Sequence, residues 1–152
     1  MGTLTSLIGG KAVAFDSAPV IYFIEEHPLY LVLVDELFDV LDRGHAHGMT
    51  STLTLMEVLV RPLRAGRRDL VEAYRRLLTR AIGITLHPLD QRTCESAAQL
   101  RANQPWLRTP DALQVATALE HGADLMVTND ERWRRLREVR IVVLKDYVTA
   151  GP

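Results

Sequence analysis

The chain has little that would tie it to an oxidising compartment or to a membrane. Its 152 residues include one cysteine, Cys94, so no internal disulfide can form, which agrees with a reducing cytoplasm. No apolar run reaches the ~18 residues that a membrane-spanning helix requires. The first residues lack the basic segment and long apolar core of a secretory signal peptide. We therefore expect a cytoplasmic protein without membrane contact.

Glycine-rich nucleotide-binding loops are also missing. Neither GxGxxG nor GxxxxGK[ST] follows the first apolar run, which argues against a dinucleotide- or triphosphate-binding domain. An aspartyl-phosphate hydrolase would need a second Asp two residues after Asp16, where Ala18 stands. A receiver-like phosphoacceptor domain, which has an acidic pocket and a late Lys, remains a minor alternative because Lys145 follows the last apolar run.

Lysine is scarce, and the positive charge is unevenly distributed. Only Lys11 and Lys145 of the 18 basic residues are lysines. Residues 1–50 carry two basic and seven acidic side chains, whereas residues 51–110 carry ten basic and five acidic ones. The net charge is −1, so the chain has no general attraction to polyanions. The arginines near residues 61–68 are either a solvated helix face or contacts for backbone phosphates.

Short apolar runs alternate with longer helical segments along the whole chain. The candidate strands are residues 13–15, 49–51, 82–86, 125–128 and 141–144. The helical segments are residues 18–26, 29–43, 54–64, 68–81, 90–103, 111–121 and 131–137. This alternation predicts an α/β fold around a mainly parallel sheet. No linker divides the chain, so we expect a short extension at residues 1–11 and a single domain at residues 12–150.

The segment at residues 29–43 is apolar on more sides than a surface helix requires. Its first half contains four consecutive apolar residues, Leu31 to Val34, and further apolar residues follow. A surface helix needs only one apolar stripe. The segment is therefore either buried on both sides or an exposed patch for a partner or a second subunit, and we favour the patch.

Four carboxylates follow the strands or lie near the starts of the next helices. They are Asp16, Glu57, Asp111 and Asp130. In a parallel α/β sheet, the carboxyl ends of strands and the amino ends of helices share one edge, where ligand sites form. All four acids are placed to reach that edge.

Each acid also has a simpler structural explanation. Asp16 or Ser17 can cap a helix, and Thr54 to Glu57 matches a capping box. Thr109-Pro110-Asp111 is a typical helix start, and Asp130 can cap the segment at 131–137. An acid near a helix amino end gains about 0.3–1 kcal/mol.

Convergence of the acids would have a larger energetic effect than capping. Two carboxylates about 4 Å apart repel by roughly 4 kcal/mol at an effective dielectric constant of about 20. A converged set therefore needs a cation or shared protons. Carboxylates without Cys or His ligands favour Mg²⁺ or Mn²⁺ over Zn²⁺.

Four segments in order carry a family resemblance: VAFDSAPVIYFIE, STLTLMEVLVRPLRAG, TPDALQVATALEHGADLMVTND and IVVL. With these, the chain resembles the PIN-domain family, most closely its VapC-like toxin branch. The resemblance implies a three-layer α/β/α sandwich with a central parallel sheet of four to five strands. It also implies a Mg²⁺- or Mn²⁺-dependent nuclease that usually acts on RNA. The family's acidic quartet maps onto Asp16, Glu57, Asp111 and Asp130, and its small polar residue onto Thr128.

We therefore expect a metal-dependent ribonuclease, the toxin of a toxin–antitoxin pair. Asp16, Glu57 and Asp111 would hold the metal, Asp130 would complete the site or hold a second ion, and Thr128 would position a water or bond to a carboxylate. The resemblance further implies a small antitoxin protein, a homodimer, and an antitoxin groove at residues 29–43. The alternatives are a non-catalytic PIN-like binding or regulatory module and a nuclease that acts on single-stranded DNA.

Overall fold

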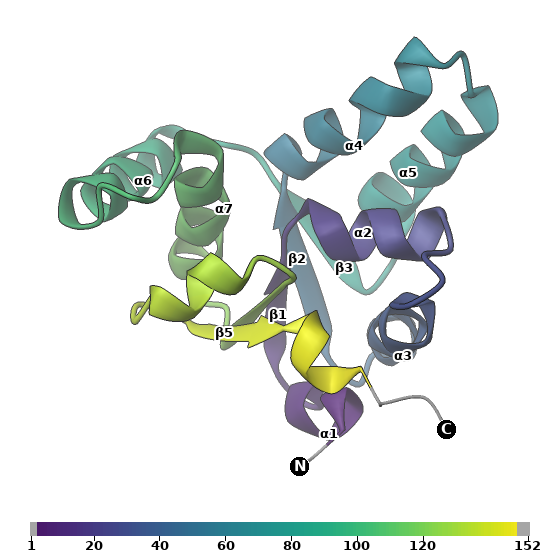
Figure 1. Cartoon of the computed structure of the whole chain (residues 1–152), viewed down its shortest axis with the longest axis horizontal. Coiled ribbons are helices and arrows are strands. Elements are labelled where there is room, and N and C mark those ends of the chain that lie inside the picture. The colour runs from purple at the N-terminus through teal and green to yellow at the C-terminus, as the bar shows by residue number, and fades with distance from the viewer. Residues whose placement is uncertain (1–2, 149–152) are drawn as a thin grey trace.

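A computed structural model of the chain describes residues 3–148 and contains a five-stranded parallel sheet (Figure 1). The order of the strands is β3-β2-β1-β4-β5, and every neighbouring pair is parallel. The strands are β1 (Ala12–Phe15), β2 (His47–Ser51), β3 (Ile84–His87), β4 (Leu125–Thr128) and β5 (Arg140–Val143). The predicted parallel α/β architecture is confirmed, with five strands.

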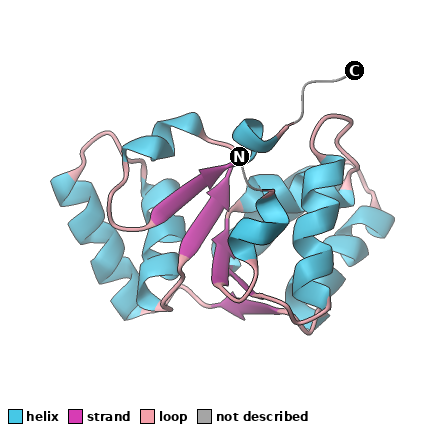
Figure 2. Ribbon diagram, turned by 90° about the horizontal axis from the view of Figure 1, so that it is seen from below, coloured by secondary structure: helices cyan, strands magenta, loops and turns pink. Residues whose placement is uncertain are grey.

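Helices cover both faces of the sheet, so the molecule has three layers (Figure 2). The α-helices are α1 (Leu4–Ile8), α2 (Ser17–Ile24), α3 (Leu31–Asp42), α4 (Thr52–Arg64), α5 (Arg68–Arg80), α6 (Gln91–Asn103) and α7 (Thr109–Glu120). Two short 3₁₀ helices follow the last two strands: η1 (Glu131–Arg135) and η2 (Leu144–Tyr147). Within residues 3–148, no helix combines the length and the apolar character needed to cross a membrane.

The alternation of side chains along each strand creates two separate cores. Val13 and Phe15 of β1 point into a core that also contains buried residues of α1, α2, α3, α4 and α5. Ala14, between them, points into a core formed with α6, α7 and η1. Successive side chains of a strand face opposite sides of the sheet. Strands buried on both faces are apolar at successive positions, which explains why the runs were recognisable in the sequence.

The extension expected at residues 1–11 contains helix α1. Thr3 caps this helix by accepting a hydrogen bond from the Ser6 backbone N–H at 3.1 Å. Leu4 and Ile8 are buried in the core that contains α3. At the other end, residues 149–150 of the expected domain lie outside the described residues.

Helix α3 buries only one side against the core, although the first half of its sequence is apolar on nearly every side. Its buried residues are Val34, Leu37, Phe38, Val40 and Leu41, which form a single stripe toward the core. Val32 is 72% exposed, and Leu29, just before the helix, is 55% exposed. The helix is therefore covered on one side, and a small part of its apolar surface is open.

Candidate functional site

The ends of β1 and β4 bring Asp16 and Thr128 together. Phe15 pairs with Val127 in the sheet, so the residues that follow them are neighbours at its carboxyl edge. The Thr128 hydroxyl donates a hydrogen bond to Asp16 Oδ2 at 2.7 Å and accepts one from the backbone N–H of Asp130 at 3.1 Å. The predicted bond between Thr128 and a carboxylate is present, and it fixes the orientation of Asp16.

Asp16 is the most perturbed acid at this edge. It occupies the N-cap position of α2 without a well-formed side-chain capping hydrogen bond, although the Ala18 backbone N–H is close enough to lower its pKa. Its Oδ1 atom is buried and has no hydrogen-bond partner among residues 3–148. Burial is the main reason that the pKa of Asp16 is raised to about 7; Glu57 and Asp111 contribute to the increase, and the bonds from Thr128 and the Ala18 backbone oppose it. Asp16 is therefore a carboxyl group that holds a proton near neutral pH unless a cation replaces it.

Glu57 is fixed by two residues from other elements. The Ser17 hydroxyl donates to Glu57 Oε1 at 2.9 Å, and the Gln114 amide donates to the same oxygen at 3.3 Å. The capping-box explanation for Glu57 was wrong, because α4 begins at Thr52 with Ser51 as its N-cap. Glu57 thus lies in the second turn of α4, where its contacts are to the site.

Gln114, which bonds Glu57, also belongs to a buried network of hydrogen bonds. The Gln114 amide donates to Thr54 Oγ1 at 2.8 Å, and Gln114 Oε1 accepts from the Ser51 hydroxyl at 3.0 Å. Thr54 and Thr50 are bonded at 2.8 Å, and the Thr50 hydroxyl donates to the Phe15 carbonyl at 2.7 Å. Since Thr50 uses its proton on that carbonyl, Thr54 must be the donor between the two threonines. The network therefore connects α7, α4 and β2 to the end of β1.

Sequence reasoning missed the two residues that hold Glu57. Gln114 is a polar residue within the mostly apolar segment that became α7, and that contrast was its only sequence signal. Ser17 was considered only as a helix cap. Its actual bond joins residues 40 positions apart, which no local pattern indicates.

Asp111 lies in the first turn of α7, as predicted. The structure places the N-cap at Arg108 instead of Thr109, and Arg108 makes no side-chain capping bond there. The Arg108 guanidinium instead lies 3.3 Å from Asp111 Oδ2. The Asp111 side chain is 14% exposed, so it retains access to the surface of the site.

Asp130 is already engaged by neighbouring groups. It caps η1 by accepting from the Arg132 backbone N–H at 3.0 Å, so the simpler explanation for this acid is correct as far as geometry goes. The Arg132 guanidinium also bonds both Asp130 oxygens, and this pairing lowers the pKa of Asp130. Arg132 further lies 3.9 Å from Asp111. Asp130 is therefore charged and paired, in contrast to Asp16.

The predicted quartet does not form one compact ligand cluster. Within residues 3–148, no three Asp, Glu, His or Cys side chains are arranged to hold a single ion. Asp16, Glu57 and Asp111 nevertheless lie close enough to influence one another electrostatically. Mg²⁺ is usually held by one or two carboxylates together with waters and substrate phosphates. The buried, unpartnered Oδ1 of Asp16 fits a site of that kind.

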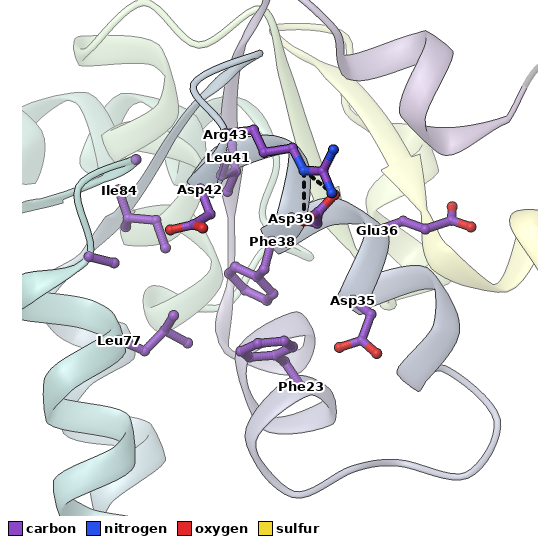
Figure 3. A pocket seen from close by; sticks show the side chains of 12 residues that line it. Phe23, Asp35, Glu36, Phe38, Asp39, Leu41, Asp42, Arg43, Leu77 and Ile84 are labelled. Atoms are coloured by element: carbon purple, nitrogen blue, oxygen red, sulfur yellow. Dashed lines mark hydrogen bonds and ion pairs between the residues drawn. The ribbon is translucent and has the colours of Figure 1, made fainter.

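A pocket of about 650 Å³ lies beside α3 and is lined by residues outside this acidic edge. Phe23 and Phe38 face each other in it with ring centroids 4.6 Å apart, and Leu77 of α5 lines the opposite wall (Figure 3). Acidic residues of α3 line its rim: Asp35, Glu36, Asp39 and Asp42. Arg43 also lines the pocket and pairs with Asp39 at 3.0 Å, so the pocket combines an apolar floor with a border of net negative charge.

Comparisons with known proteins agree with the fold. The family model described as PIN domain matches residues 13–139. Among solved structures, VapBC2 from Rickettsia felis bound to a DNA fragment from its promoter has 13% identity and a TM-score of 0.70, covering 87% of this chain and 98% of that chain. A toxin–antitoxin complex from Klebsiella pneumoniae has 18% identity and a TM-score of 0.66, covering 87% and 97%. DNA-bound VapBC from Salmonella typhimurium has 18% identity and a TM-score of 0.65, covering 88% and 98%. No curated protein matches this sequence.

Proposed function

The chain belongs to the PIN-domain family, and from that premise we propose that it is a divalent-metal-dependent ribonuclease, the toxin of a toxin–antitoxin pair. The observation that carries the proposal is Asp16, at the carboxyl edge of the sheet, whose buried Oδ1 atom has no hydrogen-bond partner within residues 3–148. Burial and the nearby Glu57 and Asp111 raise its pKa to about 7. A cation at this edge would stabilise the ionised form of Asp16 and give its Oδ1 atom a partner.

In this proposal, the residues of the site divide the work of binding and positioning. Asp16 and Asp111 hold Mg²⁺ or Mn²⁺, with Glu57 as a further ligand or as the acceptor for a bound water. Such an ion, when present, supplies a water of lowered pKa and neutralises charge on the phosphoryl group. Thr128 keeps Asp16 in one orientation, and Ser17 does the same for Glu57.

Asp130 and Arg132 have supporting roles in the proposal. Asp130 stays paired with Arg132 and caps η1. The Arg132 guanidinium, 3.9 Å from Asp111, would be near a phosphate bound at this edge. Arginine is suited to that contact because its planar fork matches phosphate oxygens.

Cleavage of RNA by the purified protein tests the proposed activity. The protein should cut single-stranded RNA with Mg²⁺ or Mn²⁺ and stop cutting in EDTA. Asp16→Asn should abolish cleavage, whereas Glu95→Gln, which changes an exposed acid on α6, should leave it intact. Cleavage of RNA by Asp16→Asn at the wild-type rate would refute the assignment, and cleavage of single-stranded DNA alone would redirect it to that substrate.

The pocket beside α3 supports the proposed antitoxin partner. Its apolar floor and acidic rim fit a basic amphipathic segment of a small protein. Exposed Leu29 and Val32 extend the apolar surface next to it. Structural similarity to toxin–antitoxin complexes is consistent with this partner. The homodimer implied by the resemblance stays a prediction.

Charge reversal on the rim tests the partner. Asp35→Lys with Glu36→Lys should weaken binding of the protein encoded by a short neighbouring reading frame, because both residues line the pocket. Glu95→Lys on α6 is the control. Equal affinity of all three proteins in a pull-down titration would argue against this pocket as the antitoxin site.

A further inference from the structure

In the α4–α5 hairpin, three arginines of α5 share one carboxylate, whereas the two arginines of α4 have none within the described residues. Three arginines of α5 converge on Glu72, at 3.4, 3.9 and 3.6 Å: Arg75, Arg76 and Arg80. On α4, Arg61 and Arg64 are exposed, and no carboxylate in residues 3–148 forms an ion pair with either. The charge of α4 is therefore available to an external anion.

The two free arginines lie on the same flank of α4 as Glu57. Positions 57, 61 and 64 are spaced i, i+4 and i+7, which places them in one row along a helix. Val58 and Pro62 are buried on a different side. With a rise of about 1.5 Å per residue, Arg64 lies roughly 10 Å beyond Glu57 along the axis. Figure 1 shows that α4 starts at the sheet and projects away from it, so the row leads outward from the site.

We propose that this flank of α4, here named the arginine track (Arg61 and Arg64), binds the phosphate backbone of single-stranded RNA that enters the site; the proposal rests on the ribonuclease function above. Guanidinium groups bind phosphate oxygens through paired hydrogen bonds. Contacts to phosphates position a strand without recognising its bases. The acidic rim formed by α3 would repel the same strand. The strand must be single because its scissile phosphate has to reach Asp16, whose Oδ1 is buried at the end of β1.

Binding can be measured without cleavage by fluorescence anisotropy in EDTA. The probe is a labelled single-stranded RNA of mixed sequence and about 20 nucleotides, longer than a typical single-strand site. Arg61→Gln with Arg64→Gln removes the track. Arg76→Gln with Arg80→Gln is the matched control, since it removes two charges from the same hairpin at positions that share Glu72 with Arg75. Thermal melting of both variants checks that they fold.

The track variant should bind the RNA about tenfold more weakly at low salt. The slope of log affinity against log salt should become shallower by about 1.4, the value for two lost single-strand contacts. The control variant should match the wild type. Equal binding by the track variant, an equal loss in the control, or tighter binding of duplex RNA or of single-stranded DNA would each overturn the proposal.

Cleavage assays separate this proposal from the proposed function. If the wild type cuts no RNA with Mg²⁺ or Mn²⁺ but binds it through the track, the ribonuclease assignment fails and the binding surface stands. If the wild type cuts RNA and the track variant binds it as well as the wild type, the track fails and the ribonuclease assignment stands.

Discussion

Replacement of Asp16 with Asn is expected to stabilise the protein in EDTA at and above neutral pH. Burial raises the pKa of Asp16 from 3.8 to about 7. Between these values, the native state keeps a proton that the unfolded state has lost. The free energy of unfolding must therefore fall as the pH rises from about 4 to about 7, and the destabilisation is complete above that range. Asn cannot ionise, so the substitution removes this loss.

The size of the effect follows from the pKa. Each pH unit of difference between native and unfolded states corresponds to about 1.4 kcal/mol, so a shift of roughly three units corresponds to about 4 kcal/mol. Entry of water beside the ionised carboxylate reduces the penalty, so we expect Asp16→Asn to be more stable than the wild type by about 2–4 kcal/mol at pH ~8. A gain of that size is large for the replacement of one polar residue.

Urea unfolding from about pH 5 to about pH 8 measures the difference. Wild type, Asp16→Asn and Asp35→Asn, an exposed acid on α3, are compared in EDTA. Burial lowers the pKa of His87. Its contribution to the free energy of unfolding therefore falls as the pH drops below the ordinary pKa of histidine. That contribution is common to all three proteins and cancels in their differences. Parallel curves for wild type and Asp16→Asn would refute the assignment of the proton to Asp16.

Three further substitutions test the surroundings of the site. Gln114→Leu should destabilise the protein by about 2 kcal/mol, because it removes the acceptor for the buried Ser51 hydroxyl and the donor to Thr54, while exposed Gln99→Leu should be nearly neutral in the same urea assay. Gly83→Ala should lower the melting temperature, because an added Cβ would lie 2.1 Å from a carbonyl oxygen of α3; Gly9→Ala, with its nearest contact at 3.6 Å, should not. Arg132→Gln should strengthen Mn²⁺ binding severalfold in calorimetry, because its positive charge lies 3.9 Å from the acid of α7; unchanged affinity would place the ion elsewhere.

The strands and most helices could be predicted because their signals are local. Burial on both faces produced continuous apolar runs, and four-residue β4 was predicted with its observed bounds, Leu125–Thr128. The third strand was displaced: residues 82–86 were expected, and Ile84–His87 forms the strand. Ile82 is 95% exposed, so an apolar residue there misled the prediction. Gly83 precedes the strand, at a point where the backbone of Leu41 comes too close for a side chain.

Helix α1 was missed because its five residues are too few for a helical pattern of apolar residues to repeat. An isolated helix of that length is unstable, and its stability comes from tertiary packing. Leu4 and Ile8 become buried through contact with the core around α3, which lies more than 20 residues further along the chain. The sequence contained the apolar residues and the Thr3 cap, but nothing local indicated the surface against which they pack.

The contrast between Asp16 and Asp130 shows where prediction of the site reached its limit. Both aspartates follow a strand, and Thr128 contacts both by bonding the carboxylate of one and the backbone N–H of the other. Burial raises the pKa of Asp16, whereas the Arg132 guanidinium lowers that of Asp130. Topology alone could place both at the sheet edge but could not distinguish them. A cation that enters here has to displace only a proton from Asp16, whereas binding to Asp130 requires competition with a bidentate arginine. Under the proposed function, Asp16 would therefore be the primary ligand, and Asp130 would mainly position the arginine.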